Sequence, residues 1–322
     1  MRRAATRSAT PFPGIAIIAG ASVALVISGC RRSPTPAPTI APPEQRTVLT
    51  SFYPLTYFTR RIAGNRVQVE CPCPTTVDPS FWIPTRSDLS RFQAASLVLL
   101  NGAGYEHWTA GAALSASRTI ETAQPFADEF LQLPTLTHSH GAAGPHTHSG
   151  VDGHTWMDPV HARQQAEEIL SALSKRWPAD ASVFAKGFEE LTVDLRRLDS
   201  RYRDLTPRLS NVVIYASHPA YGYVAQRYLW QIKNVVLPPD EMPSPDTWHQ
   251  LLTEIAPGST TQKLILFEEK PLDALRDRLS HELKLTSVVF RPCENAPVGE
   301  DYLSVMLHNI DELQRALRPS PQ

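Results

Sequence analysis

The feature that most constrains the fold is an amphipathic stripe in the middle of the chain, flanked on both sides by alternating strands and helices. Across 181–206, apolar residues recur at alternating steps of four and three: Phe184, Phe188, Leu191, Leu195, Leu198, Tyr202 and Leu205. This spacing predicts one continuous helix about 40 Å long at about 1.5 Å per residue. A helix of that length can connect two lobes as a rigid strut.

Strand-like and helical runs alternate before and after this helix. The strand-like runs are TVLTSF, RVQVEC, LVLLNG and RTIETA in the first half, and NVVIYAS, IKNVVLP, KLILFEE and TSVVFR in the second. Such alternation is typical of a parallel α/β sheet. We therefore predict two similar α/β lobes, 47–180 and 207–322, joined by the helix 181–206. Ligands of such sheets bind beyond the carboxyl ends of the strands, so a cleft is expected between the lobes.

The first 46 residues are typical of an export signal followed by a tether. A basic start, MRRAATRSATPFP, precedes the apolar run GIAIIAGASVALVIS, which is too short for a comfortable membrane span of about 20 residues. The run ends in VISGC, so 1–30 is interpreted as a lipoprotein signal peptide with Cys30 as the lipidated residue; an ordinary signal peptide is the alternative. The proline-rich stretch 31–46 is expected to be an extended tether. We thus expect an exported, envelope-located, lipid-anchored protein.

Charge and cysteine content narrow the possible functions. The net charge is −1 and the pI is near 6.8, which does not favour nucleic-acid binding, since that needs a strongly basic face. Three cysteines remain after Cys30, namely Cys71, Cys73 and Cys293. In an oxidising compartment, an odd number is compatible with one disulfide and one free thiol.

Two histidines on opposite sides of the long helix are candidate metal ligands. His154, in HTWMDP, precedes a helix that begins near Pro159, and His218, in SHPAYGY, follows a predicted strand. Neutral imidazole is the commonest protein ligand of zinc. Two such residues from facing lobes would suit a metal held across the cleft, although two unrelated, hydrogen-bonded histidines remain the alternative.

The segment 138–154 contains five histidines among glycine, alanine and serine. We expect it to form neither helix nor strand, because it lacks apolar anchors and ordering it would cost much backbone entropy. His154 stands apart from the others, since Trp156 and Asp158 follow it where ordered structure resumes. The remaining histidines are interpreted as accessory, weaker metal-binding residues: His138, His140, His146 and His148.

Several motifs occur in a recognisable order along the chain. They are SFYPLTYFTRRIAGNRVQV, VDPSFWIPT, LVLLNGAGYEHW, HTWMDPVHARQQ, SHPAYGY, LFEEKP and GEDYLSVMLHNIDEL. Together they resemble the periplasmic zinc- and manganese-binding proteins of metal-uptake ABC transporters, particularly the zinc-type members. The resemblance covers nearly all of 47–317 and implies two α/β lobes with the metal between them. It also implies that the histidine-rich segment gathers zinc near the cleft.

The resemblance assigns the metal ligands residue by residue. The histidines of the family's H-x-W-x-D-P and S-H-x-A-x-x-Y motifs fall on His154 and His218. The first histidine of the family's V-D-P-H-x-x-E-P motif falls on Ser80, a departure that weakens the site. Candidates to complete it are a water at Ser80, the thiolates of Cys73 or Cys293, and Glu294; the competing expectation is that Cys293 forms a disulfide with Cys71 or Cys73.

The implied function is that of a monomeric receptor that captures a divalent ion and delivers it to an ABC permease. Zinc is the expected ion, and Mn²⁺ or a softer metal such as Cu(I) is the alternative. The departure at Ser80 leaves room for an exported metallochaperone or metal buffer without a transporter. A metal-dependent hydrolase is disfavoured, because no motif places a general base beside the histidines; Glu294 and Glu269 are the only acids expected near the cleft. We therefore expect a binding protein and not an enzyme.

Overall fold

The computed structural model describes residues 46–139, 145–255 and 261–317. The predicted signal peptide 1–30, Cys30, all but the last residue of the tether 31–46, and His140 lie outside the described residues. Among the described residues, no helix combines the length and the apolar character needed to cross a bilayer.

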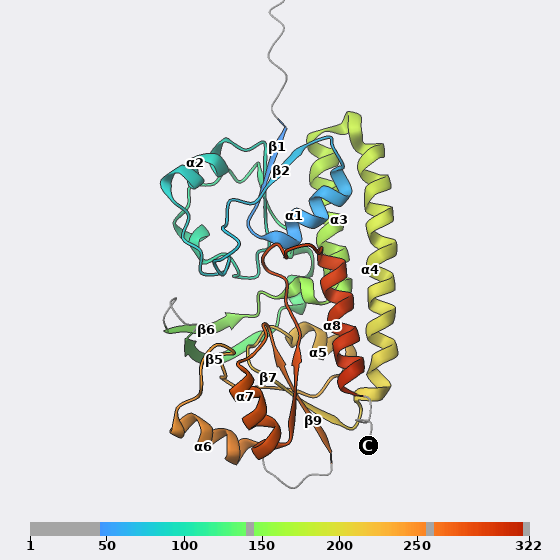
Figure 1. Ribbon diagram of the computed structural model, residues 1–322. Helices are drawn as coiled ribbons and strands as arrows, with labels where there is room; N and C mark the ends of the chain where they lie inside the picture. Colours follow the sequence, from blue (N-terminus) through green and yellow to red (C-terminus); the bar gives the residue numbers. More distant parts are fainter. Residues whose placement is uncertain (1–45, 140–144, 256–260, 318–322) are drawn as a thin grey trace, which may run out of the picture. The chain divides into compact units, whose positions relative to one another are not determined.

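Two parallel four-stranded sheets form the framework (Figure 1), as predicted. The first has the order β2-β1-β3-β4 and consists of β1 (Thr47–Thr50), β2 (Gln68–Glu70), β3 (Leu97–Leu100) and β4 (Thr119–Glu121). The second has the order β10-β9-β7-β8 and consists of β7 (Val212–Ala216), β8 (Ile232–Asn234), β9 (Gln262–Phe267) and β10 (Leu285–Val289). The register pairs Leu49 with Val98 in the first sheet and Ile214 with Leu264 in the second. Each sheet thus presents its carboxyl edge on one side.

Helices follow the strands as the sequence pattern indicates. They are α1 (Tyr53–Ala63), α2 (Arg86–Ala94), α3 (Pro159–Arg176), α4 (Ala181–Leu209), α5 (Gly222–Tyr228), α6 (Pro245–Glu254), α7 (Asp273–Arg278) and α8 (Tyr302–Ala316). At the starts of α2, α3, α6 and α8, a polar side chain accepts a hydrogen bond from an otherwise unpaired backbone N–H. Thr85 caps α2 in a reciprocal pair with Asp88, and Asp158 caps α3 through the N–H of Val160.

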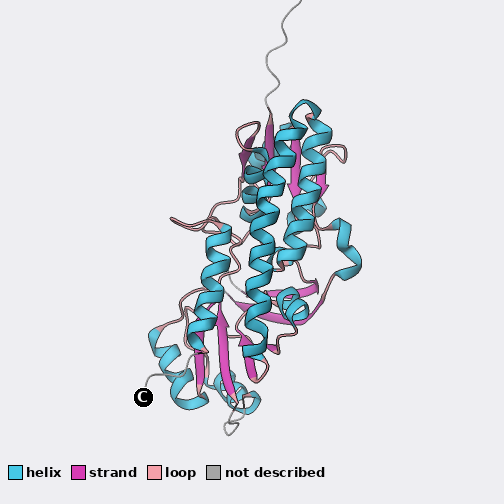
Figure 2. Cartoon of the chain, turned by 90° about the vertical axis from the view of Figure 1, so that its right-hand side faces the viewer, coloured by secondary structure: helices cyan, strands magenta, loops and turns pink. Residues whose placement is uncertain are grey.

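The long helix α4 is continuous over 29 residues, three beyond the predicted end at 206, because Pro207 is accommodated within its last turn. Six of the seven stripe residues are buried and Phe188 is partly buried; full burial of one such side chain contributes about 1.5–3 kcal/mol. The helix packs on α1 and α3 along its first part and on α5 and α8 along its second (Figure 2). At Gly187 an added Cβ would lie 2.5 Å from the carbonyl of Ile62, so α1 approaches α4 closely only because a glycine stands there.

One hydrophobic core runs through both halves of the chain. It includes Val48 and Leu99 of the first sheet, Leu205 of α4, and Ile214 and Leu264 of the second sheet. Contacts likewise join 45–322 into one compact unit. The two predicted lobes therefore share their core, and the division of the chain at 180 and 207 stays a prediction.

The histidine-rich segment contains regular structure, which corrects the expectation of a segment with no strand. Strands β5 (Gln132–Ser139) and β6 (Pro145–Val151) pair as an antiparallel hairpin in which His138 is opposite His146 and His148 is opposite Leu136. The physical reason is that an antiparallel ladder satisfies backbone groups locally, and the threonines and leucines of QLPTLTHS favour extended backbone.

Candidate metal site

His154 and His218 lie side by side, as the sequence predicted. His154 precedes a short 3₁₀ turn (Thr155–Met157) that leads into α3, and His218 follows β7. Both are buried, at 6% and 4% exposure. Their ring centroids are 5.6 Å apart and the planes meet at 84°. The fold thus brings together two imidazoles that are far apart in the chain.

This separation suits one shared ion. A zinc ion lies about 2.0–2.1 Å from an imidazole nitrogen, and so about 3.2 Å from the ring centre. Two imidazoles at a tetrahedral angle around one ion therefore have centroids about 5.3 Å apart. The observed 5.6 Å differs from this by a few tenths of an ångström. The spacing of the two rings is therefore compatible with one cation held between them.

His154 is held by two carboxylates. Its Nδ1 is 2.8 Å from Oδ1 of Asp152, and its Nε2 is 3.5 Å from Oε1 of Glu294. Burial by itself lowers the pKa of His154, but Asp152 and Glu294 outweigh burial and raise the pKa from 6.5 to about 10. From the sequence, Trp156 and Asp158 were expected to hold His154 in place, and the ring of Trp156 does pack beside it, at 5.3 Å between centroids. Asp158 instead caps α3 and binds Arg227, because its side chain points along the helix start.

Further acidic residues surround the histidines. Burial, together with the charges of Glu294 and Asp78, raises the pKa of Glu268 to about 8, and the charge of His154 opposes this rise. Like charges that raise the pKa of a carboxyl group disfavour its ionised form. The sequence placed Glu269 near the cleft; Glu269 is exposed and its charge acts on Glu268, and it is Glu268 whose charge interacts with His154.

The loop after β10 carries Glu294 across to the other half. Its carbonyl accepts a hydrogen bond from the Tyr53 N–H at 3.0 Å, and Asn295 donates to the carbonyl of Val77 at 3.0 Å. Cys293 adopts a left-handed backbone with φ of 66°, which costs a non-glycine residue about 1–2 kcal/mol. Such strain persists where the surroundings dictate it, often at functional sites. Here it belongs to the turn that places Glu294 beside His154.

Ser80 lies near this region but is engaged elsewhere. Its hydroxyl and its backbone N–H both donate to Oδ1 of Asp78, at 2.7 and 2.9 Å. At the position where the family has a histidine, this chain therefore has a serine that donates hydrogen bonds to the carboxylate of Asp78. Asp78 is in turn one of the charges that act on Glu268.

The three cysteines are free, so the expected disulfide is wrong. Cys73 packs in the cluster around Trp82 and Phe92, whereas Cys293 belongs to the main core, and this separates the sulfurs. Burial, together with the charge of Cys71, raises the pKa of Cys73 to about 12. Burial and the charge of Glu294 raise the pKa of Cys293 well above its ordinary value. Both groups are therefore thiols, which are poorer metal ligands than thiolates.

The described residues around His154 and His218 do not form a preassembled cluster of metal-binding side chains. Within 46–139, 145–255 and 261–317, no three His, Cys, Asp or Glu side chains already converge as a metal-binding group. The two imidazoles of His154 and His218 do lie side by side.

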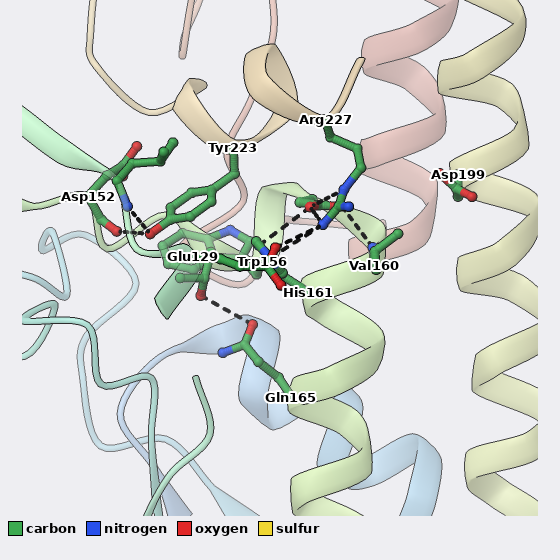
Figure 3. Close-up of polar contacts among 12 residues, drawn as sticks. Glu129, Asp152, Trp156, Val160, His161, Gln165, Asp199, Tyr223 and Arg227 are labelled. Carbon is green, nitrogen blue, oxygen red and sulfur yellow. Dashed lines mark hydrogen bonds and ion pairs between the residues drawn. The ribbon is translucent and has the colours of Figure 1, made fainter. Parts of the chain in front are cut away.

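The site rests on polar contacts between segments from both halves (Figure 3). Arg227 of α5 donates to Asp158 at 2.7 Å and lies 3.7 Å from Glu129. His161 contacts Glu129 at 3.0 Å and stacks on the ring of Phe126 at 4.3 Å. These contacts fix the start of α3, and with it the turn that carries His154.

Sequence reasoning missed several residues at the site. Asp152 stands two positions before His154, a spacing at which a carboxylate can bind the following backbone N–H, and this signal could have been found. Tyr105 is buried with its ring edge-on to His154, at 6.1 Å between centroids. Its hydroxyl is near the charges of Glu294 and Asp78, a placement that only the tertiary fold reveals.

Comparisons with known proteins agree with this arrangement. Residues 48–316 match the family model described as zinc-uptake complex component A, periplasmic. The high-affinity zinc uptake system protein ZnuA of Bacillus subtilis is 28% identical over 309 residues, covering 91% of this chain and 94% of that protein. The zinc-binding lipoprotein AdcA of Streptococcus pneumoniae is 26% identical, and the match spans 83% of this chain but only 55% of AdcA.

Solved structures show the same fold. The metal-dependent lipoprotein YcdH of Bacillus subtilis superposes with a TM-score of 0.71 at 25% identity, covering 84% of this chain and 98% of that one. Zn(II)-bound AdcA of Streptococcus pneumoniae superposes with a TM-score of 0.70 at 25% identity, covering 86% of this chain and 59% of that one.

Proposed function

This chain belongs to the family of periplasmic zinc-uptake complex component A, and from this premise we propose that it captures one divalent metal ion, foremost Zn²⁺, between His154 and His218. The observation that carries the proposal is the 5.6 Å separation of two buried imidazoles from opposite halves of the chain. Family members are binding proteins and not enzymes, which removes the hydrolase alternative.

Carboxylates complete the proposed site. Glu294 already lies 3.5 Å from Nε2 of His154, and Glu268 is a further acid whose charge interacts with His154. Cys73 and Cys293 are less suited because burial keeps them protonated. Ser80 contributes indirectly, by hydrogen bonding to Asp78. Because carboxylate oxygens also suit harder ions, Mn²⁺ is the alternative cargo.

Release follows from the way the halves are joined. The shared core and the long helix α4 disfavour a wide opening of two independent domains. The loop that carries Glu294 is attached to the first half by hydrogen bonds from Tyr53 to the carbonyl of Glu294, from Trp156 to the carbonyl of Pro292, and from Asn295 to the carbonyl of Val77. We infer that docking on an ABC permease displaces this loop, which removes a ligand and frees the ion.

Location and assembly follow from the family and the N-terminal sequence. Proteins of this family act outside the cytoplasmic membrane, and related proteins are lipoproteins. We infer that Cys30 carries the lipid anchor, that 31–46 tethers the folded part to the membrane, and that the protein acts as a monomer beside its permease.

The test is a zinc titration of the mature protein with single-histidine variants. Loss of a residue that only hydrogen-bonds to a metal ligand weakens binding by at most about 100-fold. Because His154 and His218 are proposed to bind the ion directly, His154→Ala and His218→Ala should each weaken zinc binding by more than this. His249→Ala is the matched control, because His249 is exposed on α6. Wild-type affinity in either site variant would refute the proposal.

A further inference from the structure

Asp152 lies next to the proposed ligand His154, at the end of β6. Its Oδ1 is 2.8 Å from Nδ1 of His154 and 2.9 Å from the backbone nitrogen of the same residue. The carboxylate thus accepts a hydrogen bond from each of these two N–H groups. Together the two bonds fix the imidazole of His154 relative to the backbone of His154. The other ring nitrogen, Nε2, then faces Glu294 at 3.5 Å and is the one available to an ion.

The backbone around Asp152 is held from both halves of the chain. Its N–H donates to the carbonyl of Leu131, and its carbonyl accepts from the hydroxyl of Tyr223, both at 2.8 Å (Figure 3). The carbonyl of Gly153 accepts from the side chain of Asn101 at 2.9 Å. Asp152 is fully buried. The carboxylate therefore has a fixed starting point and little freedom to turn away.

Neighbouring glycines show that the carboxylate fits closely. An added Cβ at Gly222 would lie 2.6 Å from Oδ2 of Asp152, and one at Gly153 would lie 2.8 Å from the ring of Tyr105. Among the described residues, Oδ2 has no hydrogen-bond partner. A buried carboxylate is costly, and an unpaired buried oxygen calls for a reason. The bonds of this side chain go to His154 alone within the described part of the chain.

We propose that Asp152 is the positioning residue of the metal site: it keeps the proton of His154 on Nδ1 and aims Nε2 at the ion. This inference rests on the proposed function and extends it to a residue that does not touch the metal. Partners of this kind typically change metal affinity about 10–100-fold. The backbone N–H of Asp152 also bonds to Leu131, directly before β5, at the open end of the β5–β6 hairpin. Because Asp152 stands only two positions before His154, it connects that hairpin to the proposed ligand.

The test compares Asp152→Ala and Asp152→Asn with the parent protein. Alanine removes the acceptor, whereas the oxygen of asparagine can still accept the Nδ1–H, so asparagine should rescue much of the effect. We expect zinc affinity to fall about 10–100-fold in the alanine variant and less than about 10-fold in the asparagine variant. Asp180→Ala is the control for general destabilisation, since Asp180 pairs with Arg46 and Arg66 away from the site.

A second readout does not depend on metal. The Nδ1 proton of His154 should give a slowly exchanging NMR signal in the metal-free parent and in the asparagine variant, and no such signal in the alanine variant. Parent-like affinity of the alanine variant, or absence of the signal from the parent, would overturn the positioning role. If the signal behaves as expected but the parent takes up no Zn²⁺, the proposed function fails while the hydrogen bond stands.

Discussion

Metal capture should release protons, because the site holds protons that a cation must displace. Between Asp152 and Glu294, His154 has its pKa raised to about 10 despite burial, so the metal-free protein carries an imidazolium there. An imidazole must lose its Nε2 proton before it can bind a metal. Burial and the neighbouring carboxylates raise the pKa of Glu268 to about 8, so this group is also protonated near neutrality.

The number of protons released can be worked out from these values. Near pH 6.5, both groups are almost fully protonated, and metal binding should release about two protons. Near pH 8.5, Glu268 is mostly ionised and His154 is not, so the count should fall to about one. Because the carboxylates interact, the proton counts at intermediate pH values belong to the set of interacting groups and not to one residue. Apparent zinc affinity should accordingly rise with pH, by roughly 100-fold per unit near pH 6.5 and roughly 10-fold per unit near pH 8.5.

Calorimetry in buffers of different ionisation enthalpy measures this count directly. The number of protons released, given by the slope of the observed enthalpy against buffer ionisation enthalpy with its sign reversed, should be near two at pH 6.5 and near one at pH 8.5. Glu268→Gln should lower the first value toward one and leave the second almost unchanged. A slope near zero at both pH values would show that His154 is neutral before binding, and would refute the electrostatic reasoning.

Three further predictions concern other parts of the molecule. Burial raises the pKa of Glu106 from 4.5 to about 7, so the folded state holds a proton that the unfolded state releases. The free energy of unfolding should therefore fall by up to about 3 kcal/mol between pH 5 and 8. Urea titrations measure this fall, and Glu106→Gln should reduce it. Arg227→Met leaves the buried carboxylate of Asp158 without its ion pair, and should lower the free energy of unfolding by about 2–4 kcal/mol, measured by urea denaturation. Deleting 138–148 should keep the tight zinc site and remove weaker ones, as counted by calorimetry.

Each of these has a control and a contradicting result. Arg203→Met is the control for Arg227, since Arg203 pairs with Asp199 on an exposed part of α4, and this substitution should lower the free energy of unfolding much less. Equal losses in the two arginine variants would contradict the importance of the buried pair. A pH profile of Glu106→Gln parallel to that of the parent would rule out Glu106 as the titrating group. Loss of the tight site on deletion would show that the hairpin is part of it.

The sequence predicted the framework because the framework is periodic. The stripe from Phe184 to Leu205 has helical spacing, and apolar runs such as Leu97–Leu100 are typical of buried parallel strands, so two sheets and one long helix could be predicted without tertiary information. The pairing of His154 with His218 followed from placing both at the cleft edge of an α/β lobe and from the family resemblance.

The rest depends on contacts that no local pattern encodes. Whether Glu268 or Glu269 turns inward is decided by where β9 ends, and a shift of one residue reverses the face. The free state of Cys293 depends on a core that separates it from Cys73. The hairpin formed by β5 and β6 was missed because glycine and histidine content outweighed threonine in the sequence reasoning, while backbone pairing decided the outcome.

Anomalous diffraction at the zinc edge from crystals of the mature protein loaded with one equivalent of Zn²⁺ tests the central claim most directly. The account predicts a single strong peak about 2.0–2.1 Å from Nε2 of His154 and at the same distance from a ring nitrogen of His218, with an oxygen of Glu294 completing the shell. A peak bound by only one of these rings, or by the β5–β6 hairpin alone, would contradict it.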